Sequence, residues 1–260
     1  SAVRTAGPRG GAADGVAAAV PLAARQVVGG PWSTVPAAYD RIADNFAQHR
    51  AYPWPFVTEW LEGGPCRGER LLVAGCGDGR NVAIALDLRR FSKIWALDVS
   101  RGMLDAARRR LGMDRLAEGV GEASPGVACM LHGDVREVPL PDRACDAALA
   151  CAVLHHLPAA ASREALGELA RVLAPGGRLL ASCWDPSAKA VLKRGRPAGD
   201  GEGCAYWVAW RCADGEDVDR WYHLPSMAER EELWAGVPGL SLQRASLVGD
   251  NQVFEWTAAG

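Results

Sequence analysis

The chain has 260 residues, of which 49% are hydrophobic, and this share is enough to build the core of one large domain. Its formal net charge of −2 gives no overall basic field, so any contact with nucleic acid has to use a local patch. The eight cysteines include no C-x-x-C pair, which favours reduced thiols over a disulfide scaffold or a zinc site, and no apolar run approaches the ~18 residues of a membrane span.

Residues 1–30 are rich in alanine and glycine and carry Arg4, Arg9 and Arg25 against a single acid, Asp14. Such a segment buries too little apolar surface to offset the entropy of ordering it, so we expect disorder here. An organelle-targeting peptide is the alternative, because those peptides are rich in arginine and poor in acids. We expect a cytoplasmic protein, with the nucleus or an organelle left open.

Two short helices are expected next. Residues 38–46 place Tyr39 and Phe46 on one helical stripe, Pro53 interrupts the pattern, and residues 56–61 resume it.

The most informative stretch follows. An apolar run at residues 71–74 breaks into glycines at every second position, Gly75, Gly77 and Gly79, and an amphipathic segment comes directly after them. This is the pattern of a strand that turns sharply into a helix, where the backbone can approach a ligand and the helix N-terminus offers free N–H groups. The spacing is tighter than the G-x-G-x-x-G of dinucleotide sites and is typical of S-adenosylmethionine (SAM) sites. A tight turn without a ligand is the alternative.

Residues 93–98 read as a buried strand that ends in Asp98. In a doubly wound sheet the second strand lies beside the first, so this acid faces the same crevice and can accept both ribose hydroxyls of a nucleoside. Asp98 or Ser100 can also cap the following helix, and the two roles are compatible if Ser100 is the cap.

Three further sequence features follow in the order expected of a doubly wound sheet. Asp134 ends a third strand, where it can accept a hydrogen bond from an adenine amino group. The strand at residues 146–151 runs into His155 and His156, and a helix stops at the Pro-Gly-Gly of residues 175–177.

The alternation of strands and helices over residues 70–184, with a glycine-rich insertion at 112–126, predicts a parallel sheet with helices on both faces. A helix at 226–234 and two strands, at 240–248 and 253–257, complete it. Together with the SAM-type glycine spacing, this order of elements resembles the class I SAM-dependent methyltransferases. The resemblance implies an α/β fold over residues 31–260, with a Rossmann-like doubly wound sheet that is mostly parallel and a last strand that is antiparallel.

Residues 185–218 show no clear periodicity, so we expect an insertion loop that is functional or partly disordered. Its cations at positions 189–196 either meet nucleic-acid phosphates or are simply solvated.

The cofactor is expected to be SAM. Its binding residues are expected to be Gly75, Cys76, Gly77, Gly79, Arg80, Asn81, Asp98, Val99, Ser100, Asp134, Val135 and Cys151.

Several short motifs occur together in order over residues 37–257. They are Tyr39-Asp40-Arg41-Ile42-Ala43, Arg50, Pro53-Trp54-Pro55, Gly75-Cys76-Gly77-Asp78-Gly79-Arg80-Asn81, Val153-Leu154-His155-His156 and Trp221-Tyr222-His223. This set resembles the tRNA wobble-uridine carboxymethyl methyltransferases, which are related to the methyltransferase domain of the AlkB-type tRNA-modifying proteins. The resemblance implies that a carboxylate on a uridine side chain is methylated to an ester.

A carboxylate is already a nucleophile at neutral pH, so this chemistry needs alignment and a cation that holds the acid, and no general base. The expected catalytic residues are Arg50, His155, His156, Tyr222 and His223. One of the two adjacent histidines can instead cap a turn and pack in the core. Trp54 either stacks on the base or anchors the N-terminal helix.

The chain departs from the family at three positions. Val73 stands where the family carries an acid that holds the SAM ammonium. Asp78 stands where the family often has asparagine, and it is a candidate to compensate. Gln252 stands where the family usually has tryptophan. The alternatives are therefore a small-molecule methyltransferase on the same fold and a SAM- or tRNA-binding adaptor without turnover.

The resemblance also implies two partners, the anticodon loop of tRNA and a small zinc-containing methyltransferase activator subunit that pairs with an edge strand. The third strand, Val127 to His132, lies at the edge in this topology, and its apolar residues include no lysine or proline that would protect it. Alternatively, the insertion at 112–126 folds over this edge.

Overall fold

A computed structural model describes residues 30–49, 53–63, 69–113, 127–199 and 203–260. The N-terminal segment expected to be disordered or targeting, apart from its last residue, and most of the insertion at 112–126 therefore lie outside the described residues. Among the described helices, none combines the length and the apolar character that a membrane crossing requires.

The core of the molecule is a seven-stranded sheet with the order β3-β2-β1-β4-β5-β10-β9. Its strands are β1 (Glu69–Ala74), β2 (Phe91–Asp98), β3 (Val127–His132), β4 (Cys145–Cys151), β5 (Leu173–Trp184), β9 (Leu240–Val248) and β10 (Asn251–Ala258). Strands β1 to β5 pair in parallel, and β10 pairs antiparallel with both β5 and β9. The predicted class, the mostly parallel sheet and the antiparallel last strand are confirmed, and β3 lies at one edge.

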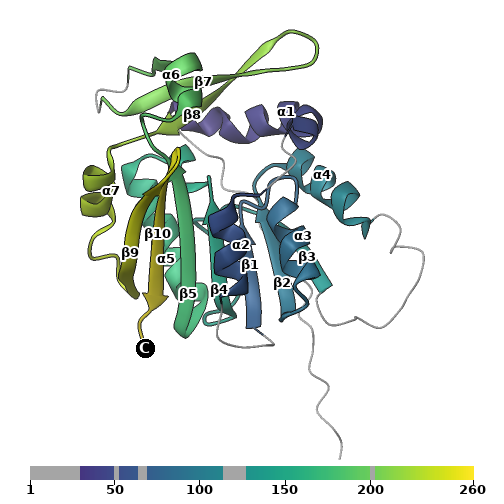
Figure 1. The fold of residues 1–260 in the computed structure, drawn as a ribbon, viewed down its shortest axis with the longest axis vertical. Helices are drawn as coiled ribbons and strands as arrows, with labels where there is room; N and C mark the ends of the chain where they lie inside the picture. Colours follow the sequence, from purple (N-terminus) through teal and green to yellow (C-terminus); the bar gives the residue numbers. More distant parts are fainter. Residues whose placement is uncertain (1–29, 50–52, 64–68, 114–126, 200–202) are drawn as a thin grey trace, which may run out of the picture.

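Helices cover both faces of this sheet (Figure 1). The described helices are α1 (Val35–His49), α2 (Pro55–Glu62), α3 (Arg80–Asp87), α4 (Arg101–Leu111), α5 (Ala159–Val172), α6 (Lys189–Arg194) and α7 (Met227–Trp234), with 3-10 turns at Pro31–Thr34 and Leu154–His156. Of these, α1 and α6 lie over one end of the sheet and not on its faces.

The alternation of side chains along β1 divides the core into two layers. Leu71 and Val73 pack with residues of α2, α3 and α4 on one face. Leu72 and Ala74 pack with residues of α5 and α7 on the other face. Strand β1 pairs with β2 on one side and with β4 on the other, so the direction in which successive strands are added changes between β1 and β4. Ligands of such folds bind at this point, beside the C-terminal ends of the strands.

The region 185–218 corrects the sequence expectation of a loop. It holds α6 and most of a second sheet, in which β6 (Gly195–Pro197), β7 (Ala205–Arg211) and β8 (Asp217–His223) pair antiparallel in that order. The strands are short, and both sheet faces carry aromatic and charged residues, so neither period 2 nor period 3.6 stands out in the sequence. A smaller correction concerns β5, which begins at Leu173 and so includes the Pro-Gly-Gly turn.

The second sheet and α1 lie together over one end of the main sheet, at the top of Figure 1. Helix α1 contacts both α4 and β8. Asp40 ties α1 to the start of α4, since its Oδ1 accepts hydrogen bonds from Ser100 Oγ at 2.6 Å and from the Gly102 N–H at 2.9 Å. The C-terminal ends of the parallel strands are therefore roofed by α1 and β8.

Candidate functional site

A cavity lies beneath this roof, at the C-terminal ends of β1, β2 and β4. Its wall combines the glycine loop, the ends of three strands, the 3-10 turn after β4, and residues of α1, β5 and β8. Its lining includes Trp32, Tyr39, Trp54, Gly75, Cys76, Gly77, Asp78, Arg80, Asn81, Asp98, Val99, Asp134, Val135, Cys151, Val153, His155, His156, Trp184, Arg220 and Tyr222.

Glycine is required at two positions of the loop between β1 and α3. Gly75 has a φ of +66°, and a Cβ there would lie 2.1 Å from Val153 Cγ2. Gly79 is the N-cap of α3 in the left-handed conformation, at a φ of +81°, and packs against Ala107 of α4. Gly79 therefore shapes the loop and is not among the residues that line the cavity, and its expected contact with the cofactor stays a prediction.

Asp98 ends β2 at the cavity with 9% of its surface exposed. Its Oδ2 accepts the Gly77 N–H at 2.8 Å, and its Oδ1 accepts the Ser100 N–H at 2.9 Å. Burial raises the pKa of this carboxyl to about 6, although hydrogen bonds from the Ser100 and Gly77 backbone oppose the shift. Each oxygen keeps a lone pair, so the acid fits two ribose hydroxyls.

Ser100 is the helix cap, because its Oγ accepts the Met103 N–H at 3.1 Å while donating to Asp40. The predicted capping role is confirmed. Ser100 is not among the residues that line the cavity, and its expected contact with the cofactor stays a prediction. The cap leaves the Asp98 side chain available to a ligand.

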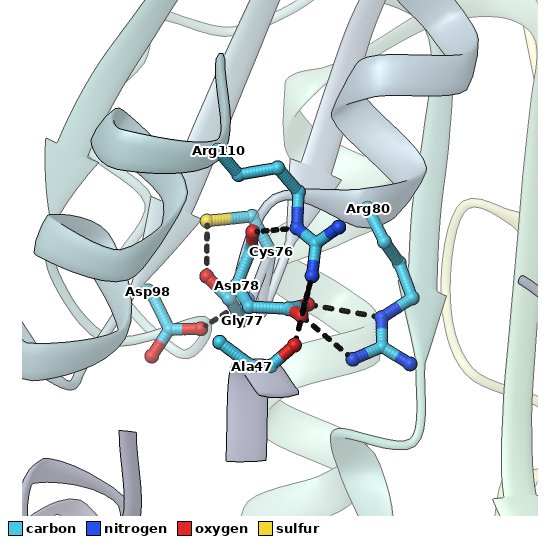
Figure 2. A network of polar contacts seen from close by, with 7 residues as sticks. All are labelled: Ala47, Cys76, Gly77, Asp78, Arg80, Asp98 and Arg110. Carbon is cyan, nitrogen blue, oxygen red and sulfur yellow. Dashed lines mark hydrogen bonds and ion pairs between the residues drawn. The ribbon is translucent and has the colours of Figure 1, made fainter. Parts of the chain in front are cut away.

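Asp78 is enclosed by two guanidinium groups (Figure 2). Arg80 donates to Oδ1 at 2.9 Å and to Oδ2 at 2.8 Å, and Arg110 of α4 donates to Oδ2 at 2.7 Å and to the Asp78 carbonyl at 2.9 Å. Arg110 also reaches the Ala47 carbonyl of α1 at 3.2 Å. Both guanidinium groups compensate the charge of Asp78, which also lines the cavity. Whether Asp78 stands in for the acid that the family carries at position 73 therefore stays a prediction.

Val73 itself lies in the hydrophobic core and does not reach the cavity. Asn81 offers a different acceptor, because its buried Oδ1 has no hydrogen-bond partner among the described residues. Asn81 lines the cavity at the start of α3. An orphaned buried oxygen is costly, and a ligand ammonium would satisfy it. The glycine loop, Asp98 and Asn81 together fit the ends of SAM.

Asp134, the acid expected after the third strand, lines the cavity, but its carboxylate already forms an ion pair. Arg136 donates to its Oδ2 at 2.6 Å, and the guanidinium carbon of Arg136 lies 4.8 Å from the centre of the Trp32 ring. One carboxylate can accept several hydrogen bonds, so the expected bond to an adenine amino group remains a prediction.

The two adjacent histidines differ in their hydrogen bonds. His156 Nδ1 bonds to the Trp221 carbonyl at 2.8 Å, so this nitrogen carries the proton, and His156 Nε2 accepts the Tyr39 hydroxyl at 2.8 Å. Burial, opposed by the Trp221 hydrogen bond, lowers the pKa of His156 to about 3. His156 is thus a neutral, fixed part of the wall.

His155 is oriented from a different direction. Its Nδ1 accepts the Trp184 N–H at 2.9 Å, which places the proton of a neutral ring on Nε2. The ring lies 4.8 Å from that of Tyr222, and Tyr222 stacks on Trp184 at 5.0 Å with an interplanar angle of 9°. These three rings and Trp54 line the same cavity as the glycine loop, and together they are called the aromatic wall.

Two other predicted catalytic residues have different outcomes. Arg50 lies outside the described residues. His223 does not line the cavity: it is 3% exposed, its ring is parallel to that of Trp221, and its carbonyl accepts Arg230. Successive residues of a strand face opposite sides, so Tyr222 faces the cavity and His223 faces away. The position of His223 does not support its expected catalytic role, which stays a prediction.

Arg220 is a wall residue that the sequence analysis missed. It lies on β8 two positions before Tyr222, on the same strand face, and is 2% exposed. Burial alone lowers the pKa of this guanidinium, whereas the neighbouring Tyr222 and Tyr39 raise it, and the net shift is upward. Once the Trp-Tyr-His motif is placed on a strand, the period of two identifies Arg220.

Known proteins with similar sequences are methyltransferases, in agreement with this geometry. Residues 72–181 match the model of a family described as a methyltransferase domain. A putative methyltransferase of Encephalitozoon cuniculi is 33% identical over 196 residues, which are 75% of this chain and 81% of that protein. The mouse tRNA (carboxymethyluridine(34)-5-O)-methyltransferase ALKBH8 is 34% identical over 147 residues, 56% of this chain but 19% of that protein. A malonyl-[acyl-carrier protein] O-methyltransferase of Serratia marcescens is 37% identical over 126 residues, 44% of this chain and 38% of that protein.

Solved structures share the fold. The CcbJ methyltransferase of Streptomyces caelestis superposes with a TM-score of 0.64 at 16% identity, over 86% of this chain and 98% of that one. A putative methyltransferase in complex with the Trm112 activator, from Haloferax volcanii, gives a TM-score of 0.59 at 16% identity, over 87% of this chain and 98% of that one.

The fold and the cavity thus define a class I SAM-dependent methyltransferase. The chain belongs to the methyltransferase family of its E. cuniculi relative, and its cofactor is SAM.

Proposed function

We propose that this methyltransferase acts on tRNA and esterifies the carboxylate of carboxymethyluridine at the wobble position. The observation that carries the proposal is the aromatic wall. Trp54, Trp184 and Tyr222 line the same cavity as the glycine loop, and their flat faces suit a planar base. The similarity to the mouse tRNA enzyme supports this acceptor, although that enzyme is far longer than the region it shares with this chain.

The site suits a reaction that needs no base. Bound SAM supplies an electrophilic methyl group on a positively charged sulfur, and its transfer to a carboxylate oxygen breaks the S–CH3 bond, leaves the electron pair on sulfur and moves no proton. His156 is neutral with both ring nitrogens engaged. The chain's own contribution is therefore to orient the acid and to exclude water.

Cations near the cavity offer a surface for the tRNA backbone. Lys189, Lys193 and Arg194 lie on α6, and all three are exposed. The same helix packs against Trp184 and Tyr222 through Val191. Phosphates that meet α6 would therefore lie close to the aromatic wall.

A partner at the β3 edge is the second part of the proposal. β3 is an edge strand with partly exposed Cys129, Met130 and Leu131. An activator subunit that adds a strand there would pair its open N–H and C=O groups. A structure of the same fold is a complex of a putative methyltransferase with the Trm112 activator, which supports a partner of this kind, and the place at β3 is argued from the edge strand.

A second candidate is a methyltransferase for small or carrier-bound acids. The similarity to the malonyl-[acyl-carrier protein] enzyme favours it, since a malonyl group, like a carboxymethyl group, ends in a carboxylate. The same cavity would serve both acceptors.

Labelled SAM separates the two candidates. Purified protein, with co-expressed activator where needed, is incubated with tRNA from cells lacking this protein, with tRNA from normal cells, and with a metabolite extract. We expect label in the first tRNA alone, bound as an ester that mild alkali releases, and mass spectrometry should find it on the wobble nucleoside. Asp98→Ala is the control for loss of SAM binding. Label confined to the metabolite extract would contradict the tRNA proposal and support the second candidate.

A further inference from the structure

We propose that Arg220 binds the carboxylate of the methyl acceptor and so makes this cavity selective for acids. The identity of the acceptor rests on the proposed function, whereas the evidence for the anion site is local to β8.

Arg220 is a buried cation on the wall of the reaction cavity. Its guanidinium carbon lies among four aromatic rings, 5.9 Å from the centre of Tyr39, 5.8 Å from Trp184, 5.1 Å from Trp210 and 5.3 Å from Tyr222. Two of these rings, Trp184 and Tyr222, belong to the wall proposed to hold the base. The positive charge is thus next to the place where a base would stack.

The guanidinium has unused hydrogen-bond donors. Its Nη1 donates to the Tyr39 hydroxyl at a long 3.5 Å, and its buried Nε has no partner among the described residues. No acidic side chain in the described part of the chain forms an ion pair with it. A guanidinium carries five N–H donors, so most of its capacity is available to a ligand.

The other fully buried arginine shows what this fold does with a cation that has no ligand role. Arg230 lies away from the cavity, and it donates to Gln252 Oε1 at 2.6 Å and to the His223 carbonyl at 3.1 Å. The amide of Gln252 in turn donates to the Asp185 carboxylate at 2.9 Å. The buried Nη1 of Arg230, like Nε of Arg220, has no partner among the described residues. What distinguishes the two is that Arg230 is connected to an internal acid through Gln252 and lies off the cavity, whereas Arg220 has no such acid in the described part of the chain and lines the cavity.

Aromatic rings alone do not satisfy Arg220. A ring face attracts the charge through its electron density, but the N–H donors lie in the guanidinium plane and need oxygen acceptors. A carboxylate matches two parallel donors, which fixes its direction as well as its charge. An uncharged amide of the same shape offers one oxygen and no charge.

The test compares two nucleosides that differ only in this group, 5-carboxymethyluridine and 5-carbamoylmethyluridine. Their binding is measured by calorimetry to the protein loaded with S-adenosylhomocysteine, the product that carries no methyl group to transfer. We expect the wild-type protein to prefer the acid by ~10-fold or more, the typical strength of charge-assisted hydrogen bonds. Arg220→Met should reduce the preference to within ~2-fold, because a methionine provides bulk but no donors.

Two further variants make the result specific. Arg220→Lys keeps the charge but not the planar fork, so an intermediate preference is expected. Arg196→Met is the matched control, since Arg196 lies exposed on β6 of the same sheet, pairs with Asp219 and does not line the cavity. It should keep the wild-type preference. Affinity for S-adenosylhomocysteine should be unchanged in all variants that fold.

The outcomes are separable. Undiminished acid preference in Arg220→Met, or in Arg220→Lys if the methionine variant does not fold, overturns the inference, as does equal binding of both nucleosides by the wild type. If the preference depends on Arg220 while tRNA accepts no label, the anion site stands and the tRNA proposal fails. If tRNA accepts label and the preference does not depend on Arg220, the reverse holds.

Discussion

The hydroxyl of Tyr39 donates a hydrogen bond to Nε2 of His156 across 2.8 Å, and the two residues stand 117 positions apart in the chain. Tyr39 belongs to α1, the helix over the cavity, and His156 to the turn that follows β4. The bond joins the roof to the wall and fixes which nitrogen of the imidazole carries the proton. The same hydroxyl is within 3.5 Å of Arg220 Nη1, so it also links the neutral histidine to the buried cation.

Tyr39→Phe should therefore loosen the roof. The change leaves Nε2 of a buried imidazole without its donor, and we expect a loss of about 1–3 kcal/mol in the free energy of unfolding. SAM affinity should fall as well, because α1 covers the cavity. Urea denaturation and calorimetry measure the two effects. Tyr206→Phe, on β7 and outside the cavity lining, is the control, and equal stability of the two variants would contradict the role of the hydroxyl.

The buried His156 gives stability a defined pH dependence. Its pKa is lowered to about 3 in the folded protein from 6.5, so the unfolded chain takes up a proton that the folded chain does not. This contribution is fully present above pH 6.5 and is lost as the pH falls toward 3, by up to about 1.4 kcal/mol per pH unit. Urea denaturation as a function of pH measures it. His132→Gln, at an exposed edge position, should leave the slope unchanged, and an NMR titration that places the pKa of His156 near 6.5 would refute the assignment.

The sequence revealed those parts of the site whose residues are close together along the chain. The glycine loop with its following helix is one such part, and Asp98 at the end of its strand is another, because local turn chemistry and strand order are enough to place them. Arg220 escaped prediction because its neighbours come from α1, β5 and β7, and because the period of two points to it only once residues 217–223 are known to form a strand. Sequence alone did not separate Tyr222 from His223 for a related reason: until the strand is known, neighbouring residues of a motif cannot be divided between its two faces.

Asp98 should make SAM binding depend on pH. Burial raises its pKa to about 6, and only the ionised carboxylate can accept bonds from both ribose hydroxyls. Affinity should be constant above this pH and should fall below it, approaching ~10-fold per pH unit. Asp98→Asn should bind more weakly and show no such fall. A wild-type affinity that is flat from neutral pH to about pH 5 would contradict the ribose assignment.

The raised pKa of Asp98 also affects the stability of the fold. It stabilises the folded state as the pH falls through 6, which is opposite in sign to the effect of His156. The urea denaturation that tests His156 is therefore best repeated in the Asp98→Asn variant.

Gln252 stands where the tRNA wobble-uridine methyltransferases, which this chain resembles, usually have tryptophan. The structure explains how a buried glutamine is accommodated at this position. The fully buried amide accepts from Arg230 Nε at 2.6 Å and donates to Asp185 Oδ2 at 2.9 Å and to the Pro225 carbonyl at 3.0 Å. Gln252→Leu separates the two charges and should cost about 2–4 kcal/mol of unfolding free energy. Gln243→Leu on β9, where the amide is exposed, should cost little. A double change of Gln252 and Arg230 that costs as much as the two single changes added together would show that the residues do not act as a unit.

The β3 edge should decide whether the chain works alone. An edge strand with partly exposed apolar side chains favours pairing with another chain or aggregation, so we expect the isolated protein to be poorly soluble and weak in SAM binding, and co-expression with an activator subunit to restore both. Cys129→Lys places a charge on β3 and should break the complex while the sheet remains folded. Leu242→Lys is the matched control, because β9 is the opposite edge of the same sheet and Leu242 is 44% exposed. Co-purification and circular dichroism separate loss of the complex from unfolding. An isolated chain that stays monomeric, binds SAM tightly and methylates tRNA unaided would show that β3 needs no partner strand.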